Sequence, residues 1–132
     1  MSDRRRELIS RVEAFTACFN RGDLDGLMRF FADDAVYEEV NGPVNRGPAA
    51  IRDAFEPLFS GSFGAVTFTP RDLMVDVDTE MVMASWDCHL TMDGQPKVLE
   101  GLDIYAFRGE RIVRKLAYCK ARQPRYTDAA GT

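Results

Sequence analysis

Asp103 is the residue whose position most favours chemistry, because it is an acid in an otherwise apolar row. Residues two apart lie on the same face of a strand, and this row runs from Leu99 through Tyr105 to Phe107. Burial raises the pKa of a carboxyl group, and a neutral acid can donate a hydrogen bond to a developing oxyanion. Alternatively, Asp103 is structural and binds Tyr105, a backbone amide or a base such as Lys115. The sequence leaves both interpretations open.

The alternation of polar and apolar residues gives less support for a chemical role of two further ionisable residues. Glu39 lies on a short predicted strand in which alternation turns Val36 and Val40 inward and Glu39 towards solvent. His89, the single histidine, shares a polar row with Asp87 and is expected outside any cavity. The pattern alone therefore favours a solvated Glu39 and a surface His89.

The sequence gives no signature of a metal or cofactor site. Cys18, Cys88 and Cys119 are too widely spaced for a CxxC motif, so buried free thiols are expected. The segment GSFG is too short for a dinucleotide-binding fingerprint, and no nucleophile elbow occurs. We therefore expect no metal and no cofactor.

Charge and hydropathy exclude several classes of partner. With 17 basic and 21 acidic residues the net charge is -4, so no positive field attracts a phosphate backbone, and nucleic acid is not expected. The N-terminal sequence MSDRRRELIS lacks the apolar stretch of a secretory signal, and no window approaches the ~18 apolar residues of a membrane span. A cytoplasmic protein without membrane contact is expected.

Three helices are predicted before most of the sheet, and they must help to position these side chains. Apolar residues recur at helical spacing, a glycine can end a helix and a proline can begin one. By these signals the predicted elements are a helix at 8–19 closed by Gly22, a helix at 24–31 capped by Asp23, a strand at 35–40 and a helix that begins at Pro48.

Four long strands are predicted next, separated by short turns that favour an antiparallel meander. They span residues 65–77, 80–92, 97–107 and 111–122. Pro70 cannot donate to a sheet hydrogen bond, so it is expected at a bulge or on an edge. The chain is thus predicted to be an α+β protein, with one domain at 1–122 and a polar C-terminal tail at 123–132.

This order of elements, together with the segments FFADDAVYEE, RGPAAIRDAF and GLDIYAFRGERIV, resembles the NTF2-like superfamily over about residues 4–122. Within it, the chain is similar to the SnoaL-like and ketosteroid isomerase branches. The resemblance implies a cone in which three N-terminal helices pack on a strongly curved, mainly antiparallel sheet that encloses a cavity. One fold hosts many activities, so the activity must be argued from the site.

The resemblance also implies roles for residues of the cavity. Glu39 falls where the isomerase pattern has its general base, and Asp103 falls where it has a neutral acid that donates a hydrogen bond. Phe15 stands where the pattern has a phenol hydroxyl, so the chain departs from the pattern there. Tyr105 or Tyr37 would have to supply the missing donor.

Two functions of different class are therefore predicted. The first is a cofactor-independent acid/base enzyme, of isomerase, cyclase or dehydratase type, that acts on an apolar carbonyl or polyketide-like compound. The second is a non-catalytic module that binds a hydrophobic ligand or a protein. In both cases the cavity takes an apolar ligand. Its predicted lining consists of Phe15, Phe19, Phe55, Phe68, Trp86, Cys88, Leu90, Asp103, Tyr105 and Phe107.

The outer face of the predicted sheet is apolar as well. Leu102, Ile104 and Ala106 alternate with the row of Asp103, and Leu116 and Tyr118 belong to the next strand. An apolar patch of this size is uncommon on a monomer. A homodimer through the outer sheet face is therefore predicted.

Overall fold

The first part of the chain folds into three helices, as the sequence predicts. In the computed structural model, which describes residues 3–130, these are α1 (Asp3–Asn20), α2 (Leu24–Met28) and α3 (Pro48–Phe59). No helix in that range is long and apolar enough to cross a membrane. Residues 1 and 2 of the predicted domain, and residues 131 and 132 of the predicted tail, lie outside the described residues.

The junction between α1 and α2 shows why the two helices separate. Gly22 has a positive φ of 73°, a conformation that glycine adopts without strain. Its backbone amide donates to the carbonyl of Phe19 at 3.1 Å, and the amide of Asp23 donates to the carbonyl of Cys18 at 2.9 Å. The Asp23 carboxylate accepts from the amide of Gly26 at 2.8 Å and so caps α2. The predicted helix end and N-cap are both confirmed.

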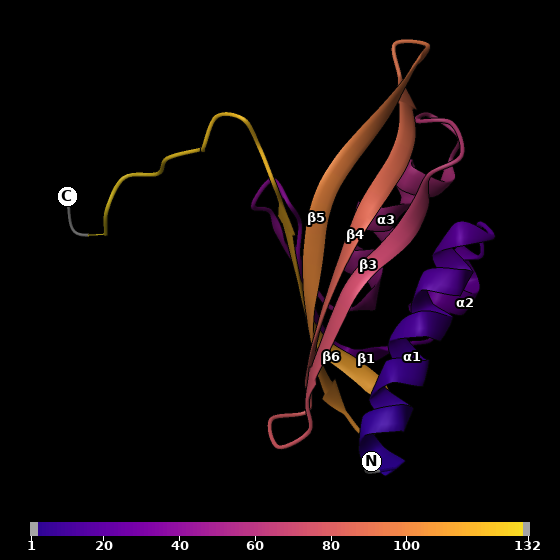
Figure 1. The fold of residues 1–132 in the computed structure, drawn as a ribbon, viewed down its shortest axis with the longest axis vertical. Coiled ribbons are helices and arrows are strands. Elements are labelled where there is room, and N and C mark those ends of the chain that lie inside the picture. The colour runs from indigo at the N-terminus through magenta and orange to yellow at the C-terminus, as the bar shows by residue number, and fades with distance from the viewer. Residues whose placement is uncertain (1–2, 131–132) are drawn as a thin grey trace.

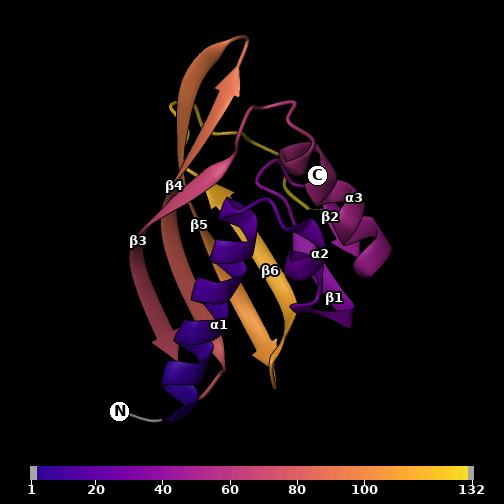
Figure 2. The same cartoon turned by 90° about the vertical axis from the view of Figure 1, so that its right-hand side faces the viewer.

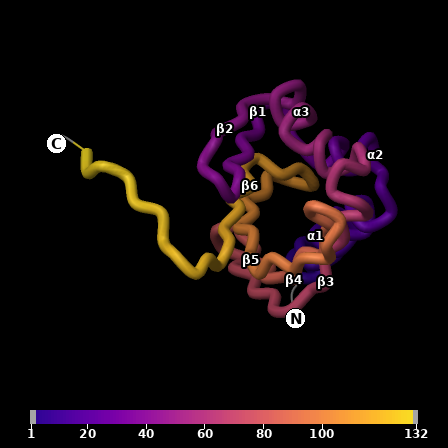
Figure 3. The backbone as a smooth tube through the Cα atoms, turned by 90° about the horizontal axis from the view of Figure 1, so that it is seen from above, coloured from indigo at the N-terminus to yellow at the C-terminus, as the bar shows by residue number. Residues whose placement is uncertain are grey.

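Six strands of the described chain form one curved, unclosed sheet (Figure 1, Figure 3). They are β1 (Phe31–Glu38), β2 (Val44–Arg46), β3 (Thr67–Asp76), β4 (Met81–Met92), β5 (Gln95–Arg108) and β6 (Arg111–Cys119). Their order across the sheet is β2-β1-β6-β5-β4-β3. Within this sheet β1 and β6 run parallel, and all other neighbours are antiparallel. The predicted α+β fold with a mainly antiparallel sheet is confirmed.

The boundaries around β1 differ from the prediction. The helix predicted to reach Phe31 ends at Met28, and the strand predicted at 35–40 already begins at Phe31. The amide of Ile112 donates to the carbonyl of Phe30 at 2.7 Å, and Phe31 pairs with Ile112. Pairing with β6 thus overrides the local helical spacing. The sequence does not predict β2, because a strand of 3 residues is too short to show alternation.

Pro70 lies on the edge strand β3 and at a bulge, in agreement with its prediction. Pro70 pairs with Trp86 and Leu73 pairs with Ala84, so three steps along β3 face two along β4. The amide of Asp72 donates to the hydroxyl oxygen of Ser85 at 3.0 Å. This bond to β4 holds the extra residue of the bulge in place.

The helices lie on the concave face of the sheet (Figure 2). The core between them is rich in aromatic rings, and its fully buried members include Leu8 of α1, Phe55 of α3 and Tyr105 of β5. Rings meet edge to face, as Phe15 and Tyr105 do with centroids 5.7 Å apart. Helices and sheet therefore cover each other's apolar surface, as predicted.

The chain beyond β6 leaves this body. The described residues 120–130 form no helix or strand and extend away from the sheet (Figure 1). Within this segment the Arg125 side chain donates to the side-chain oxygen of Asn41 at 3.2 Å. The pocket described below is thus built by residues that precede this segment.

Candidate active site

A pocket of about 410 Å³ lies between the helices and the concave face of the sheet. Most of its deep walls are aromatic, as expected of a site for an apolar ligand. Seven of the residues predicted to line a cavity do line it, namely Phe15, Phe19, Phe55, Phe68, Trp86, Asp103 and Tyr105.

Three predicted lining residues, Cys88, Leu90 and Phe107, do not belong to the lining of this pocket. They lie on the inner rows of β4 and β5, but Cys88 and Phe107 are buried in the core and Leu90 is half-buried beside it. Alternation predicts the face of a strand to which a side chain belongs, and not how far along the strand the pocket extends. The prediction is corrected for this reason.

The pocket opens between α1 and the edge strand β3. The exposed residues of its lining all come from these two elements, and they are Glu13, Ala17, Asn20, Pro70, Arg71, Asp72 and Leu73. The amide nitrogen of Asn20 donates to the carbonyl of Phe68 at 2.9 Å, and its oxygen accepts from the Phe68 amide at 2.7 Å. These two bonds join α1 to β3 beside the opening.

In the wall of the pocket, Asp103 accepts hydrogen bonds from three side chains. Asp103 is 5% exposed and lies on β5. Its Oδ2 accepts from the indole Nε1 of Trp86 at 2.9 Å and from the hydroxyl of Tyr105 at 3.2 Å. Its Oδ1 accepts from Nζ of Lys115 at 3.0 Å. Three neighbouring strands therefore supply one connected polar group.

Lys115 of β6 is as deeply buried as its partner, at 5% exposed. Its ammonium lies 4.7 Å from the ring centroid of Tyr37, 5.5 Å from that of Phe55 and 5.9 Å from that of Tyr105. Aromatic faces and a carboxylate both stabilise a cation that has lost its water. A lysine has three N–H donors, and within residues 3–130 only Asp103 accepts from this one. The remaining donors are available to a ligand.

The three donors around Asp103 favour an ionised carboxylate over the neutral acid that the resemblance implies. An ionised carboxylate can accept from all three at once, whereas a protonated acid would have to use one oxygen as a donor. Oδ1 accepts a single bond, from Lys115, and keeps a lone pair free. The geometry therefore describes a buried ion pair with one basic oxygen still available.

Gly101 makes room for the indole that binds Asp103. Trp86 pairs directly with Gly101 on β5, and a Cβ at Gly101 would collide with the indole and with the carbonyl oxygen of Tyr118. Because glycine has no side chain, the indole can lie over β5 and reach the carboxylate. Gly101 therefore helps to position the Trp86 N–H.

Burial keeps the neutral groups around this site protonated. It raises the pKa of Tyr37 and of Tyr105 well above the ordinary value of 10.0, and the charge of Asp103 adds to both shifts. Burial, followed by the charge of Asp103, also raises the pKa of the Cys88 thiol to about 11. At neutral pH both phenols are thus hydrogen-bond donors and the thiol is un-ionised.

Glu39, the predicted general base, does not share the pocket with Asp103. It follows the end of β1, it is half-buried, and its Oε2 accepts from the side-chain amide of Asn45 at 2.9 Å. The pocket lining includes Tyr37 and excludes Glu39. Alternation predicted Val36 to face inward, but Tyr37 is the buried residue, because the irregular pairing of β1 with β6 fixes which side faces the core. The catalytic role of Glu39 stays a prediction.

The other ionisable candidates also lie away from the lining. His89 is half-buried, and its Nε2 lies 3.1 Å from the hydroxyl of Thr69 on β3. Within residues 3–130, no three or more His, Cys, Asp or Glu side chains are grouped so as to hold a metal ion. Among the buried residues of the lining, the charged ones are Asp103 and Lys115.

Lys115 and Tyr37 line the pocket but are not in the predicted lining. The sequence predicts Lys115 only as a possible partner of Asp103, and Tyr37 only as a possible substitute for the phenol missing at Phe15. Lys115 lies between Val113 and Ala117 on the inward row of β6, so the signal that marks Asp103, a charge in an apolar row, also marks Lys115. For Tyr37 the sequence carries no such signal, because its face depends on the pairing of β1 with β6.

Comparison with known proteins identifies relatives of this fold. Residues 12–115 match the family described as SnoaL-like domain. A proposed polyketide cyclase from Xanthomonas campestris is 24% identical with a TM-score of 0.80, and the match covers 88% of this chain and 92% of that one.

Two further solved structures are similar. The epoxide hydrolase/cyclase-like enzyme SalBIII, which acts in pyran ring formation in the polyether salinomycin, is 21% identical with a TM-score of 0.79, over 91% of this chain and 95% of that one. An LEH-like epoxide hydrolase from M. tuberculosis is 21% identical with a TM-score of 0.75, over 87% and 84%. At such identities the likeness establishes the fold.

Proposed function

The chain belongs to the SnoaL-like domain family, and we propose that it is an acid/base enzyme of the cyclase or isomerase type that works without a cofactor. Its substrate in this proposal is an apolar carbonyl or polyketide-like compound. The observation that carries the proposal is the Asp103–Lys115 pair, which borders an aromatic pocket at an N–O distance of 3.0 Å. A base and a positive charge side by side are what proton abstraction next to a carbonyl requires.

In the first step the Asp103 carboxylate takes a proton from a carbon next to the substrate carbonyl. The C–H electron pair forms a carbon–carbon double bond, and the carbonyl π electrons move to oxygen to give an enolate. The free lone pair of Asp103 Oδ1 is the acceptor, and the ammonium of Lys115 stabilises the negative oxygen. Trp86 and Tyr105 hold the other carboxylate oxygen and so fix its orientation.

The second step returns the proton. In an isomerisation, Asp103 gives the proton to a different carbon of the enolate, and the double bond moves. In a cyclisation, the enolate carbon attacks a second carbonyl carbon of the same molecule, and the new alkoxide takes the proton from Asp103. Both routes leave Asp103 ionised and Lys115 protonated, as they began.

The relatives support this reaction class. The names of two solved structures refer to cyclase activity, and the chain shares their fold over most of its length. The pocket volume of about 410 Å³ lies in the range of small-molecule sites. An apolar compound with one or two carbonyl groups would match both the aromatic walls and the polar pair.

Exchange of substrate protons in heavy water tests the proposal whatever product the enzyme forms. A panel of steroids, terpenoids and aromatic ketones is incubated with the protein in D₂O, and deuterium incorporation is followed by mass spectrometry. We expect exchange into at least one compound, and a loss of ~100-fold or more with Asp103→Asn, because a positioned base contributes at least that much. Asp53→Asn, an exposed acid on α3, is the matched control.

The outcomes separate the competing assignments. If Glu39→Gln stops exchange and Asp103→Asn does not, the base is Glu39, as the resemblance implies, and the role proposed for Asp103 is wrong. If compounds of the panel raise the melting temperature but never exchange, the chain is the non-catalytic ligand-binding module of the alternative prediction. Circular dichroism of each variant shows that a loss of exchange is not a loss of folding.

A further inference from the structure

Two tyrosine side chains border the Asp103–Lys115 pair, and the hydroxyl of one is already engaged. The Tyr105 hydroxyl donates to Asp103 Oδ2 at 3.2 Å. The Tyr37 hydroxyl has no hydrogen-bond partner among residues 3–130, although its residue is 6% exposed. A buried tyrosine hydroxyl normally finds a partner. The hydroxyl of Tyr37 therefore needs one from outside the chain.

Tyr37 borders the pocket, and its hydroxyl is not wholly enclosed. Tyr37 belongs to the lining, and among residues 3–130 no side-chain nitrogen or oxygen that is wholly enclosed lacks a partner. The hydroxyl of Tyr37 therefore retains some free space, and this pocket is the space that its residue lines. The ring itself is held firmly, because it stacks on Phe55 with centroids 4.5 Å apart and planes at 5°.

The Tyr37 ring lies beside Lys115 in the lining of the pocket, and its hydroxyl is a donor. Burial, with the charges of Asp103 and Glu39, raises the pKa of Tyr37, so the phenol keeps its proton. The Lys115 ammonium lies 4.7 Å from the Tyr37 ring centroid and has donors left over after its bond to Asp103. Two kinds of donor, one neutral and one charged, therefore border the same space.

From this geometry we infer that Tyr37 is the hydrogen-bond donor for the ligand's oxygen, and that Lys115 binds the same oxygen. The class of ligand is an apolar ring compound with an oxygen that accepts hydrogen bonds and can carry negative charge, such as an enolisable ketone, its enolate or a phenol. Tyr37 then supplies the hydroxyl that Phe15 lacks. The inference deepens the proposed function and rests on it only for the reaction, because binding can be measured by itself.

The test compares 2-naphthol with naphthalene, which has the same rings and no oxygen. Binding is measured by the fluorescence of Trp86, the only tryptophan and part of the lining. We expect wild type to bind 2-naphthol more tightly than naphthalene. Tyr37→Phe should reduce that preference about tenfold, the equivalent of one hydrogen bond, and leave naphthalene binding unchanged. Tyr118→Phe, which alters an exposed residue outside the lining, is the matched control.

A second measurement follows binding without altering the site, and Tyr37→Phe serves only to assign a signal. The chain has four tyrosines, and fluorotyrosine labelling gives each a ¹⁹F signal. The Tyr37 signal should move with 2-naphthol and much less with naphthalene. Equal affinity for the two compounds, or a preference that survives in Tyr37→Phe, overturns the inference.

The two proposals can fail separately. If proton exchange depends on Asp103 but the preference for 2-naphthol ignores Tyr37, the proposed function stands and the donor assignment falls. If the preference depends on Tyr37 but no compound exchanges, the binding site stands and the acid/base function falls.

Discussion

The two faces of β4, β5 and β6 are built from alternate residues of the same strands, and each contains residues that depart from the usual distribution of polarity. The inner face encloses charge, because Asp103 and Lys115 are each 5% exposed. The outer face leaves apolar side chains partly uncovered, as at Met83 and Ile104, which pair with each other. A buried charge and an exposed apolar row are each unfavourable without a partner. The inner face satisfies its charges within the chain, as the Asp103–Lys115 pair, whereas the outer apolar row stays partly uncovered among residues 3–130.

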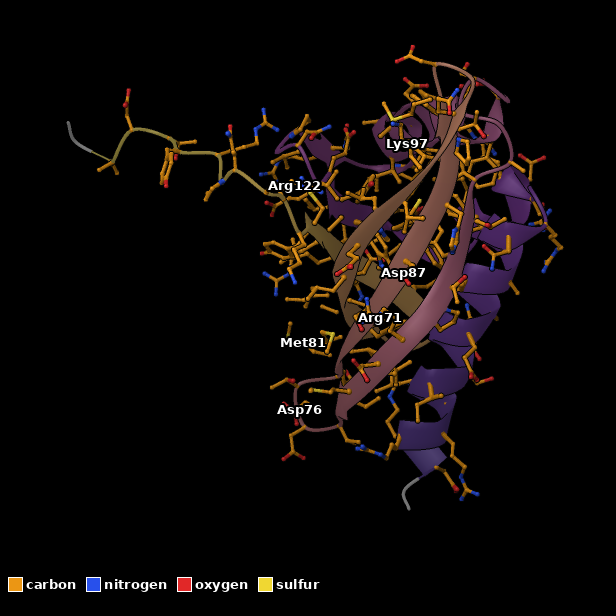
Figure 4. The ribbon with its side chains drawn as sticks, turned by 45° about the horizontal axis from the view of Figure 1, so that its top comes forward. Arg71, Asp76, Met81, Asp87, Lys97 and Arg122 are labelled. Atoms are coloured by element: carbon orange, nitrogen blue, oxygen red, sulfur yellow. The ribbon has the colours of Figure 1, made fainter. Side chains whose placement is uncertain are left out.

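The outer row crosses four strands. Met74, Met83, Ile104 and Leu116 are paired in succession from β3 to β6, and Met74 is 64% exposed. Charged residues flank this row, such as Arg71 and Asp87, which form an ion pair at 3.2 Å (Figure 4). An apolar centre within a polar rim is typical of protein interfaces. The homodimer through this face stays a prediction.

The largest effect is expected on the inner face. Lys115→Met should lower the free energy of unfolding by about 3–5 kcal/mol, because it leaves the Asp103 charge buried without its counter-ion. Urea unfolding measures it. The double variant Asp103→Leu/Lys115→Met should recover part of the loss. The control is Asp34→Asn, from an ion pair with Arg108 whose side chains are 66% and 64% exposed, and no measurable change is expected there. Equal losses of unfolding free energy for the buried and the exposed ion pair would contradict this prediction.

The next effect concerns the outer face. Wild type should have the mass of a dimer in light scattering at micromolar concentration, and Ile104→Glu should halve that mass, because it places a charge within the apolar row. Secondary structure should stay unchanged, since Ile104 does not belong to the buried core. A monomeric wild type, with Ile104→Glu soluble and of the same mass, would mean that the outer face needs no partner.

The smallest effect is expected on the inner face, where folding stability should fall at alkaline pH. Folding raises the pKa of Cys88 from 9.0 to about 11, so the folded state holds this proton more tightly than the unfolded state. That contribution to stability is complete below pH 9 and is lost as the pH rises towards 11. Tyr105 acts in the same direction above pH 10.

Urea midpoints at pH 7, 9 and 10.5 would show this decline, and Cys88→Ala provides the control. The variant is expected to start from a lower midpoint, because it leaves a cavity, and to lose less between pH 9 and 10.5. Parallel declines in the two proteins would exclude Cys88 as a source of the alkaline sensitivity.

Much of this arrangement could be predicted from alternation and turn signals. Alternation along the row from Leu99 to Phe107 predicts that Asp103 lies in a buried wall. The same two-residue period predicts that Trp86 and Tyr105 face inward. The cap at Asp23 and the bulge at Pro70 come from local chemistry that needs no distant partner. Features that are determined within one segment can thus be predicted from the sequence.

Features that depend on pairing between distant segments could not be predicted from the sequence. Whether Tyr37 or Val36 faces the core depends on how β1 meets β6, a contact between residues far apart in the chain. The same pairing moves the start of β1 to Phe31. The role of Glu39 comes from the resemblance alone, and its bond to Asn45 depends on the hairpin of β1 and β2, which the sequence does not predict.

The edge of the sheet at β3 has a consequence for behaviour at high concentration. A free edge strand can recruit the backbone of another molecule and so begin a fibre. In this protein the side chain of Asn20 occupies both backbone groups of Phe68, and Arg5 donates to the carbonyl of Val75 at 3.1 Å. Pro70 has no N–H to offer, and the bulge interrupts the regular spacing that a docking strand would need. The edge is therefore a poor template for aggregation, and concentrated solutions should remain free of fibrils.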